Sequence, residues 1–257
     1  MTTAPDAVPD YPPGRGLLAG KTVLVTAAAG TGIGFATAKR CVEEGARVAI
    51  TDIHERRLRE SAEELGALGI LANVTSQDDV DRCFADVFGE FGTLDVLVNN
   101  AGLGGTALLA EMTDDQWSSV LDVTLTGTMR MTRAALQYMG ARGSGAIVNN
   151  ASVVGWRAQA GQAHYAAAKA GVMALTRCAA IEAAEHGVRV NAVAPSLAMH
   201  AHLAKVTTEE LLAQLTTQEA FGRAAEPWEV ANVIVFLASD LSSYMTGEVL
   251  SVSSQRA

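Results

Sequence analysis

Residues 21–34 have the sequence KTVLVTAAAGTGIG, which indicates the fold class more clearly than any other segment. It begins with an apolar, β-branched run that predicts a buried strand, and it ends in a loop of small residues around Gly30, Gly32 and Gly34. The next residues, FATAKRCVEEG, have the composition of a helix. A strand, a glycine-rich turn and a helix in this order predict a dinucleotide site, because small residues let the backbone approach a pyrophosphate at a helix N-terminus. The alternative is a tight turn that needs only a positive φ.

A second apolar run, at 47–51, leads into Asp52, eighteen residues after Gly34. A carboxylate at this place can accept hydrogen bonds from the adenosine ribose hydroxyls, and it would repel a 2′-phosphate. Arg56 and Arg57 follow closely and could instead favour that phosphate. The sequence therefore predicts NAD as the cofactor, with NADP as the alternative.

Short apolar runs alternate with helical patterns along the rest of the chain. We expect strands at 22–26, 47–51, 70–74, 94–98, 146–150, 188–193 and 248–252, and helices at 33–44, 55–65, 77–91, 114–138, 162–186 and 227–238. This alternation predicts an α/β protein with a three-layer doubly wound Rossmann-like fold, in which helices cover both faces of a seven-stranded parallel sheet. We expect a single domain over 17–257, after an N-terminal tail over 1–16.

Two segments depart from the alternation. The tail at 1–16 holds four of the six prolines and lacks the apolar core of a signal peptide, so it should be disordered or pinned to the surface. Residues 196–222 form a long insertion after the sixth predicted strand, with an amphipathic piece from Glu209 to Leu215. Because loops at strand carboxyl ends build the ligand site of doubly wound folds, we expect this insertion to be a substrate lid.

Composition excludes several classes of function. The chain has 257 residues, a hydrophobic content of 49% and a formal net charge of −9 without a basic run, so nucleic acid is not an expected partner. No segment approaches the ~18 apolar residues of a membrane span, and a cytoplasmic protein is expected. Cys41, Cys83 and Cys178 are widely spaced, and His200 and His202 have no partner cluster, so neither a disulfide framework nor a metal site is predicted.

Ser152, Tyr165 and Lys169 have the composition and spacing of an alcohol/ketone redox site. Positions i and i+4 share a face of a helix, so Lys169 should lie beside Tyr165 and lower the pKa of its hydroxyl. Ser152 precedes Tyr165 by thirteen residues, and its hydroxyl could hold the substrate oxygen.

With these motifs assembled, the chain resembles the short-chain dehydrogenase/reductase family, and in particular its 3-oxoacyl reductases, over about 17–252. Asn99-Asn100-Ala101-Gly102 matches the family motif after the fourth strand, and the segment from Asn191 to Pro195 matches the motif after the sixth. FLASDLSSYMTG, at 236–247, is similar to the family's C-terminal segment. The resemblance implies a nicotinamide cofactor, a Ser–Tyr–Lys catalytic site and a homotetramer or homodimer.

The resemblance also implies which residues bind the cofactor. They are Thr26, Gly30, Thr31, Gly32, Ile33, Gly34, Asp52, Asn73, Val74, Asn100, Ala101, Gly102, Tyr165, Lys169, Pro195 and Leu197.

Some positions depart from the family pattern. The glycine loop has Ala27 where a glycine is usual, and Asn73 stands where an aspartate is common. Ser196 and His200 replace a usual glycine and threonine, and the chain ends SVSSQRA where a glycine-rich end is common. Thr124 takes the place of the catalytic asparagine, and its hydroxyl should bond the carbonyl one turn back and bend the helix.

The predicted reaction interconverts a secondary alcohol and a ketone by hydride transfer, with Tyr165 as the general acid/base and Ser152 stabilising the oxyanion. The expected pocket is largely apolar and favours a medium-sized alcohol or ketone, or an acyl thioester. Its lining residues are Leu103, Gly104, Val154, Trp156, His164, Leu197 and Met199, and Arg157 could meet a CoA phosphate. The alternatives are an NADPH-dependent 3-oxoacyl thioester reductase and a cofactor-binding protein that has lost catalysis.

Overall fold

The computed structural model describes residues 8–199 and 209–255. Among these residues, seven strands form one parallel sheet in the order β3-β2-β1-β4-β5-β6-β7. The strands are β1 (Thr22–Val25), β2 (Arg47–Asp52), β3 (Leu68–Leu71), β4 (Val96–Asn99), β5 (Gly145–Asn150), β6 (Val188–Pro195) and β7 (Val249–Val252). The predicted seven-stranded parallel sheet is confirmed, and its strand order reverses between β1 and β4, where doubly wound folds bind ligands.

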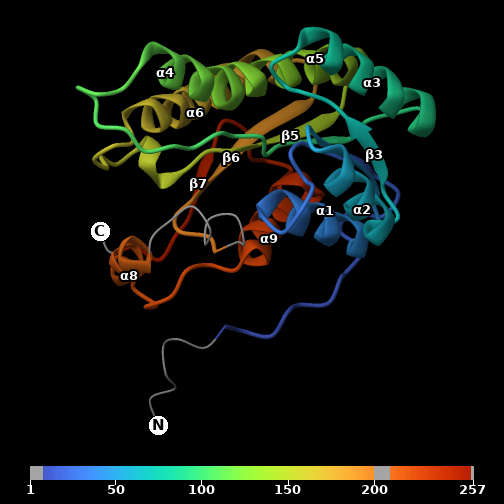
Figure 1. Ribbon diagram of the computed structural model, residues 1–257. Coiled ribbons are helices and arrows are strands. Elements are labelled where there is room, and N and C mark those ends of the chain that lie inside the picture. The colour runs from blue at the N-terminus through green and yellow to red at the C-terminus, as the bar shows by residue number, and fades with distance from the viewer. Residues whose placement is uncertain (1–7, 200–208, 256–257) are drawn as a thin grey trace.

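Helices cover both faces of the sheet, which gives the three predicted layers (Figure 1). One layer holds α3 (Gln77–Phe91), α4 (Asp114–Leu121), α5 (Gly127–Arg142) and α6 (Ala163–Ala184), and the other holds α1 (Ile33–Glu43), α2 (Glu55–Leu65) and α9 (Pro227–Ala238). Helix α8 (Glu209–Thr217) lies apart from both layers, near the carboxyl end of β7 (Figure 1). Short 3₁₀-helical turns lie at Val153–Gly155 and Asp240–Ser242.

The central strand β1 divides the core into two halves. Val23 and Val25 pack with Ile234 on the side of α1 and α9, whereas Leu24 packs with Phe84 on the side of α3 and α5. All five side chains are at most 1% exposed. Because strand side chains alternate between faces, a continuous apolar run is what a strand covered on both sides requires.

Two predicted boundaries were wrong. The third strand was expected at 70–74, but β3 ends at Leu71, because the Asn73 amide donates to the Asp79 carboxylate at 2.9 Å and Val74 packs against Gly127 instead. The predicted helix 114–138 is interrupted by a π-helical turn at Asp122–Thr126. In that turn the Gly127 amide bonds the Asp122 carbonyl, five residues back.

Residues 8–16 lie across α1 and α9, and the rest of the predicted tail, 1–7, lies outside the described residues. The Tyr11 hydroxyl donates to the Glu43 carboxylate at 2.6 Å, and the ring meets Trp228 edge-on with centroids 5.3 Å apart. The Glu44 carboxylate accepts from the amides of Arg15 and Leu17 at 2.8 and 2.9 Å.

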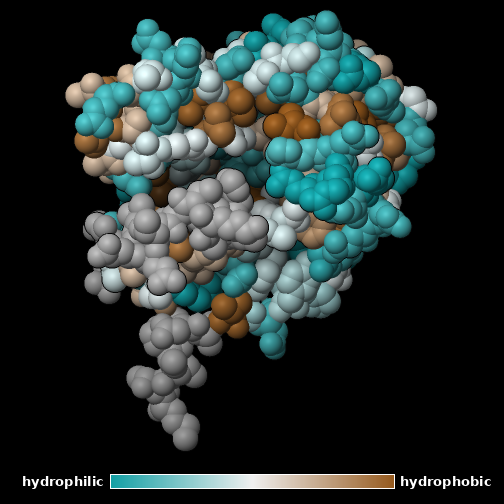
Figure 2. Space-filling model, viewed as in Figure 1, coloured by the Kyte–Doolittle hydropathy of each residue, from teal (hydrophilic) through white to brown (hydrophobic). Residues whose placement is uncertain are grey.

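The surface is mostly hydrophilic on the face seen in Figure 2. Apolar side chains gather there over the layer that holds α4, α5 and α6, at the top of the view (Figure 1, Figure 2). In the part of the chain that the structure describes, no helix has the length and apolar character needed to cross a membrane.

Candidate functional site

Ser152, Tyr165 and Lys169 come together at the carboxyl end of β5. Ser152 is the second residue after β5, and Tyr165 and Lys169 lie on the first two turns of α6. The Lys169 Nζ atom lies 5.5 Å from the centroid of the Tyr165 ring. The Ser152 hydroxyl lies near enough to the Tyr165 hydroxyl to favour its phenolate by hydrogen bonding. Gly155 permits this close packing, because a Cβ there would lie 3.0 Å from the Ala170 amide nitrogen on α6.

Burial controls the charge of this site. It lowers the pKa of Lys169, which is 3% exposed, to about 8. Burial also raises the pKa of Tyr165, and the hydrogen bond with Ser152 opposes that rise less strongly. We predicted a lowered pKa for Tyr165, so the direction was wrong for the protein without cofactor. The reason is that desolvation of a phenolate outweighs the stabilising contacts.

Lys169 is held by the backbone of β5. Its Nζ atom donates to the Asn150 carbonyl oxygen at 2.5 Å, and the Asn150 side-chain amide donates to the Asn100 side-chain oxygen at 2.9 Å. An ammonium has three donors, so this bond leaves two for other acceptors. Asn150 was not among the predicted site residues, although its place two residues before Ser152 at a strand carboxyl end could have indicated it.

Thr124 is fully buried near Lys169, but its hydroxyl makes a different bond from the predicted one. It accepts from the Leu103 amide at 3.0 Å and donates to the Leu103 carbonyl at 3.2 Å. The bond to a carbonyl one turn back is made by Thr128, whose hydroxyl donates to the Thr124 carbonyl at 2.8 Å. A Cβ on Gly102 would lie 3.5 Å from the Lys169 Nζ atom and 3.8 Å from the Thr124 Oγ1 atom, so these three residues border one small space.

The glycine loop fits a bound dinucleotide. Gly32 caps α1 without a side-chain hydrogen bond, and the first turn of α1 has no acidic residue, so nothing there opposes a phosphate. Gly30 has a φ of 112°, and a Cβ there would meet nothing within 4 Å. Gly34 has no such room, since a Cβ would lie 2.4 Å from the Asn100 side-chain nitrogen and 2.5 Å from the Ala27 carbonyl oxygen.

Thr26 and Asn100 join the glycine loop to the loop after β4. The Thr26 hydroxyl oxygen accepts from the amides of Asn100 and Ala101 at 2.9 and 3.0 Å. The Asn100 side chain donates to the carbonyls of Thr26 and Ala27 at 3.2 and 3.0 Å. The chain Thr26–Asn100–Asn150–Lys169 therefore connects the glycine loop to the redox site through hydrogen bonds.

Asp52 ends β2 beside the glycine loop. Its carboxylate accepts from the amides of Ala29 and His54 at 3.3 and 3.0 Å. Burial raises the pKa of Asp52, and the nearby Arg57 guanidinium opposes this rise. Arg56 is instead solvated and pairs with Glu60 at 3.1 Å.

Other predicted cofactor residues lie on several separate loops after the strands. Asn73 is exposed, and its side-chain oxygen accepts from the Thr75 amide at 3.0 Å. The Pro195 carbonyl accepts from the Ser152 hydroxyl at 3.5 Å, and Leu197 follows it at partial burial. Thr31 is exposed in the glycine loop, and Ile33 begins α1.

The predicted substrate pocket is described in part. Leu103 and Trp156 are 41% and 50% exposed, whereas His164 is 2% exposed. The His164 Nδ1 atom accepts from the Tyr165 amide at 2.9 Å. Arg157 donates to the Gln255 side chain at 2.6 Å, which leaves the expected contact with a CoA phosphate unsupported. Residues 200–208 of the predicted lid, with His200 and His202, lie outside the described residues.

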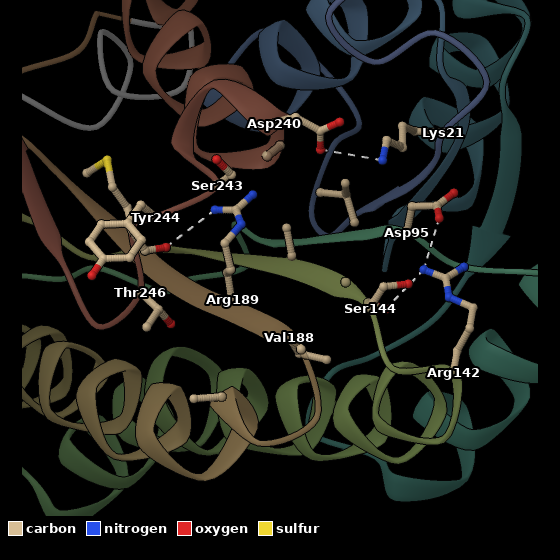
Figure 3. A pocket seen from close by; sticks show the side chains of 17 residues that line it. Lys21, Asp95, Arg142, Ser144, Val188, Arg189, Asp240, Ser243, Tyr244 and Thr246 are labelled. Atoms are coloured by element: carbon tan, nitrogen blue, oxygen red, sulfur yellow. Dashed lines mark hydrogen bonds and ion pairs between the residues drawn. The ribbon is translucent and has the colours of Figure 1, made fainter.

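A cavity of about 650 Å³ opens at the other end of the strands from the redox site, at the amino-terminal ends of β4, β5 and β6 (Figure 3). Its charged side chains already have partners. Lys21 pairs with Asp240 at 3.6 Å, Arg142 pairs with Asp95 at 2.9 Å, and Arg189 donates to the Met245 carbonyl at 3.5 Å (Figure 3). Arg189 also donates to the carbonyls of Leu237 and Ser239 at 3.0 and 3.1 Å. Because Ser152 follows the carboxyl end of β5, this cavity is separate from the predicted redox site. Among the described residues, no three His, Cys, Asp or Glu side chains are grouped to hold a metal ion.

The chain is similar in sequence to known oxidoreductases. Residues 27–254 match a family model described as enoyl-(acyl carrier protein) reductase. The chain is 64% identical to the (5R,7aS)-5-hydroxy-7a-methyl-1-oxo-2,3,5,6,7,7a-hexahydro-1H-indene-carboxyl-CoA reductase of Mycobacterium tuberculosis, over 94% of this chain and 95% of that protein. It is 39% identical to a 3-oxoacyl-(acyl-carrier-protein) reductase of Vibrio cholerae, over 92% and 97% of the two chains.

A solved structure is also similar to this chain over nearly its whole length. The crystal structure of a short chain dehydrogenase from Mycobacterium smegmatis superposes with a TM-score of 0.88 at 56% identity, covering 98% of this chain and all of the other. The chain therefore belongs to the short-chain dehydrogenase/reductase family, whose members are NAD(P)(H)-dependent oxidoreductases, and it is an enzyme of that family.

Proposed function

We propose that this enzyme interconverts a secondary alcohol and a ketone on a fused-ring carboxyl-CoA thioester, with Tyr165 as the general acid/base. The observation that carries the proposal is the meeting of Ser152, Tyr165 and Lys169 beside the glycine loop. The ring system and the thioester come from the name of the relative that is 64% identical to this chain.

The glycine loop at 30–34, with Asn100 and Lys169, would hold the cofactor. When bound, the nicotinamide accepts or donates the hydride at the substrate carbon. In the oxidation direction Tyr165 takes the hydroxyl proton, and in the reduction direction it returns a proton to the carbonyl oxygen. Ser152 donates a hydrogen bond to that oxygen and stabilises the negative charge that develops on it.

Lys169 has two tasks in this proposal. With a pKa of about 8, it is mostly protonated at neutral pH, and its charge then favours the phenolate of Tyr165. Two of its three donors remain beyond the bond to Asn150, and these can bind the ribose hydroxyls of the nicotinamide half. Thr124 acts at a distance by fixing the Gly102–Leu103 backbone next to Lys169.

We propose NAD(H) as the preferred cofactor. Asp52 supports this choice because it ends β2 beside the glycine loop, and its two oxygens accept from the amides of Ala29 and His54. A carboxylate has about four acceptor sites, so capacity remains for the adenosine ribose hydroxyls. A 2′-phosphate near the same carboxylate would be repelled.

The second candidate is an NADPH-dependent 3-oxoacyl thioester reductase. The identity of 39% to the Vibrio cholerae reductase over nearly the whole chain favours it. Arg57 lies close enough to Asp52 to oppose the rise in its pKa, and it could also attract a 2′-phosphate.

A turnover assay separates the two candidates. The purified enzyme would be given a bicyclic hydroxy- or oxo-carboxyl-CoA, the same bicyclic acid without CoA, and a linear 3-oxoacyl-CoA, each with NAD(H) and with NADP(H). We expect the highest kcat/KM for the bicyclic CoA thioester with NAD(H). A higher kcat/KM for the linear thioester with NADPH would favour the second candidate, and no turnover of any of them would contradict both.

We also propose that the enzyme is a homotetramer or homodimer, as the family resemblance implies. Helix α6 supports this, because Ile181 is 80% exposed on it and a cavity of about 540 Å³ lies between α5 and α6. Sedimentation velocity should give two or four copies, and a monomer at micromolar concentration would contradict the proposal.

A further inference from the structure

We propose that Glu219 is a positioning residue that fixes the loop leaving β6 to the C-terminal end of the chain, and that Gln255 holds a second loop to the same end. The inference rests on the proposed function, because the two loops flank Ser152. Glu219 does not touch the reacting atoms in this account, and it acts through the backbone of Leu197.

The Glu219 carboxylate is 2% exposed, and no ion pair includes it within the ranges that the structure describes. Its two oxygens accept from different segments: one from the Leu197 amide at 3.4 Å, and the other from the Ser254 hydroxyl at 2.8 Å. A buried carboxylate without a cation depends on such hydrogen bonds, because an unpaired one would strongly disfavour the folded state. The bonds to Leu197 and Ser254 are therefore coupled through one side chain.

Leu197 is fixed from both sides. Its carbonyl accepts from the Ala225 amide at 2.8 Å, while its own amide donates to Glu219. Leu197 is two residues from Pro195, whose carbonyl accepts from the Ser152 hydroxyl at 3.5 Å. A shift of the loop after β6 would therefore move a direct neighbour of the catalytic serine.

The C-terminal segment holds the other side of the site as well. Gln255 accepts from the Arg157 guanidinium at 2.6 Å, and Arg157 is five residues after Ser152. Backbone contacts support this position, since the Ala220 amide donates to the Ser254 carbonyl at 2.6 Å and Glu219 forms a short antiparallel bridge with Gln255. A glycine at 254 or 255, as in the glycine-rich end common in the family, would have no side chain for either contact.

The consequence concerns substrate affinity. Loops that are fixed before binding need not be ordered by the substrate, and this preorganisation lowers KM without changing the groups that transfer the proton and the hydride. Loss of the hydrogen bonds made by Glu219, Ser254 and Gln255 should therefore raise KM more than it lowers kcat.

The first test compares Ser254→Ala with Ser254→Thr, which keeps the hydroxyl. Ser251→Ala is the matched control, since Ser251 is an exposed serine on β7, three residues before Ser254. We expect Ser254→Ala to raise KM for the substrate about 5- to 10-fold, the effect of one lost hydrogen bond of ordinary strength, with kcat within about twofold of wild type. Ser254→Thr and Ser251→Ala should stay near wild type. An unchanged KM, or a fall in kcat alone, in Ser254→Ala would overturn the proposal.

The second test needs neither substrate nor cofactor, so it stays informative if the proposed function is wrong. Hydrogen exchange of the Leu197 amide should be at least about 10-fold faster in Ser254→Ala than in wild type, with Ser251→Ala unchanged. Adding Ser254→Ala to Glu219→Ala should raise exchange no further, because the serine acts through the carboxylate. Equal exchange of Leu197 in wild type and Ser254→Ala, or additive effects in the double variant, would contradict the coupling.

Discussion

The hydroxyl of Thr124 is hydrogen-bonded to both backbone groups of Leu103, accepting from its amide at 3.0 Å and donating to its carbonyl at 3.2 Å. These residues lie 21 positions apart, on the π-helical turn and on the loop after β4. The bonds fix the backbone next to Gly102, which borders the same small space as Lys169.

Thr124→Val keeps the shape of the side chain and removes both bonds. Two part-buried backbone groups then lose a partner, which should lower the free energy of unfolding by about 1–3 kcal/mol. Because the Gly102–Leu103 backbone lies beside Lys169, kcat should also fall about 10-fold. Thr124→Ser, which keeps the hydroxyl, is the control. Chemical denaturation and steady-state kinetics check both effects, and a valine variant equal to wild type in stability and turnover would show that the side chain only fills space.

The buried ammonium of Lys169 should give stability a pH dependence. Its pKa is about 8 in the folded protein and 10.5 when exposed, so between these values the unfolded chain binds one proton more. The contribution of Lys169 to stability therefore rises with pH across this window, by up to about 3 kcal/mol in total. Below pH 8 the penalty for burying the charge is fully present.

Lys169→Met removes the titrating group and keeps an unbranched side chain, so its stability can be compared directly with that of wild type. We expect the difference in unfolding free energy, wild type minus Lys169→Met, to increase from pH 7 to pH 9.5, a range that ends below the usual pKa of tyrosine. Urea unfolding at several pH values measures it. A difference that stays constant or decreases over this range would contradict the lowered pKa of Lys169.

Tyr165 should remain a neutral phenol in the free enzyme at mildly alkaline pH, because burial raises its pKa. Subtracting the ultraviolet titration of Tyr165→Phe from that of wild type isolates this residue from the other tyrosines. We expect the midpoint of the Tyr165 titration to lie above about pH 10, the ordinary pKa of a tyrosine. A signal with a midpoint near neutral pH would mean that Lys169 dominates even without cofactor.

Asp52→Ala should weaken the preference for NAD(H). We expect the wild-type enzyme to bind NAD(H) about 10-fold or more tightly than NADP(H), because the carboxylate can bind the ribose hydroxyls and repels a 2′-phosphate. The alanine variant should narrow that ratio. Dissociation constants from cofactor fluorescence test it, with Glu64→Ala, which removes an exposed carboxylate on α2, as the control. A wild-type enzyme that binds NADP(H) more tightly would contradict the assignment of Asp52.

Much of the architecture could be predicted from the sequence because it is encoded locally. The apolar run at 23–25 fills both halves of the core, and the glycine loop leads into an uncapped helix N-terminus, as its small residues indicate. Tyr165 and Lys169 meet because residues four apart share a helix face.

The features that could not be predicted depend on contacts between distant segments. The pKa of Tyr165 follows from burial, which the helix spacing does not reveal. Glu219 is surrounded by an ordinary polar sequence, and only the fold brings it to Leu197 and Ser254. The end of β3 likewise depends on the bond from Asn73 to Asp79.

The most direct test of the central claim is the steady-state kcat of Tyr165→Phe, measured beside the dissociation constant of the cofactor. The variant keeps the ring that packs beside Lys169 and loses only the hydroxyl. If Tyr165 is the general acid/base, kcat should fall by about 10²–10⁴ while the cofactor binds almost as well as to wild type. A variant that keeps more than about a tenth of the wild-type kcat would contradict the account.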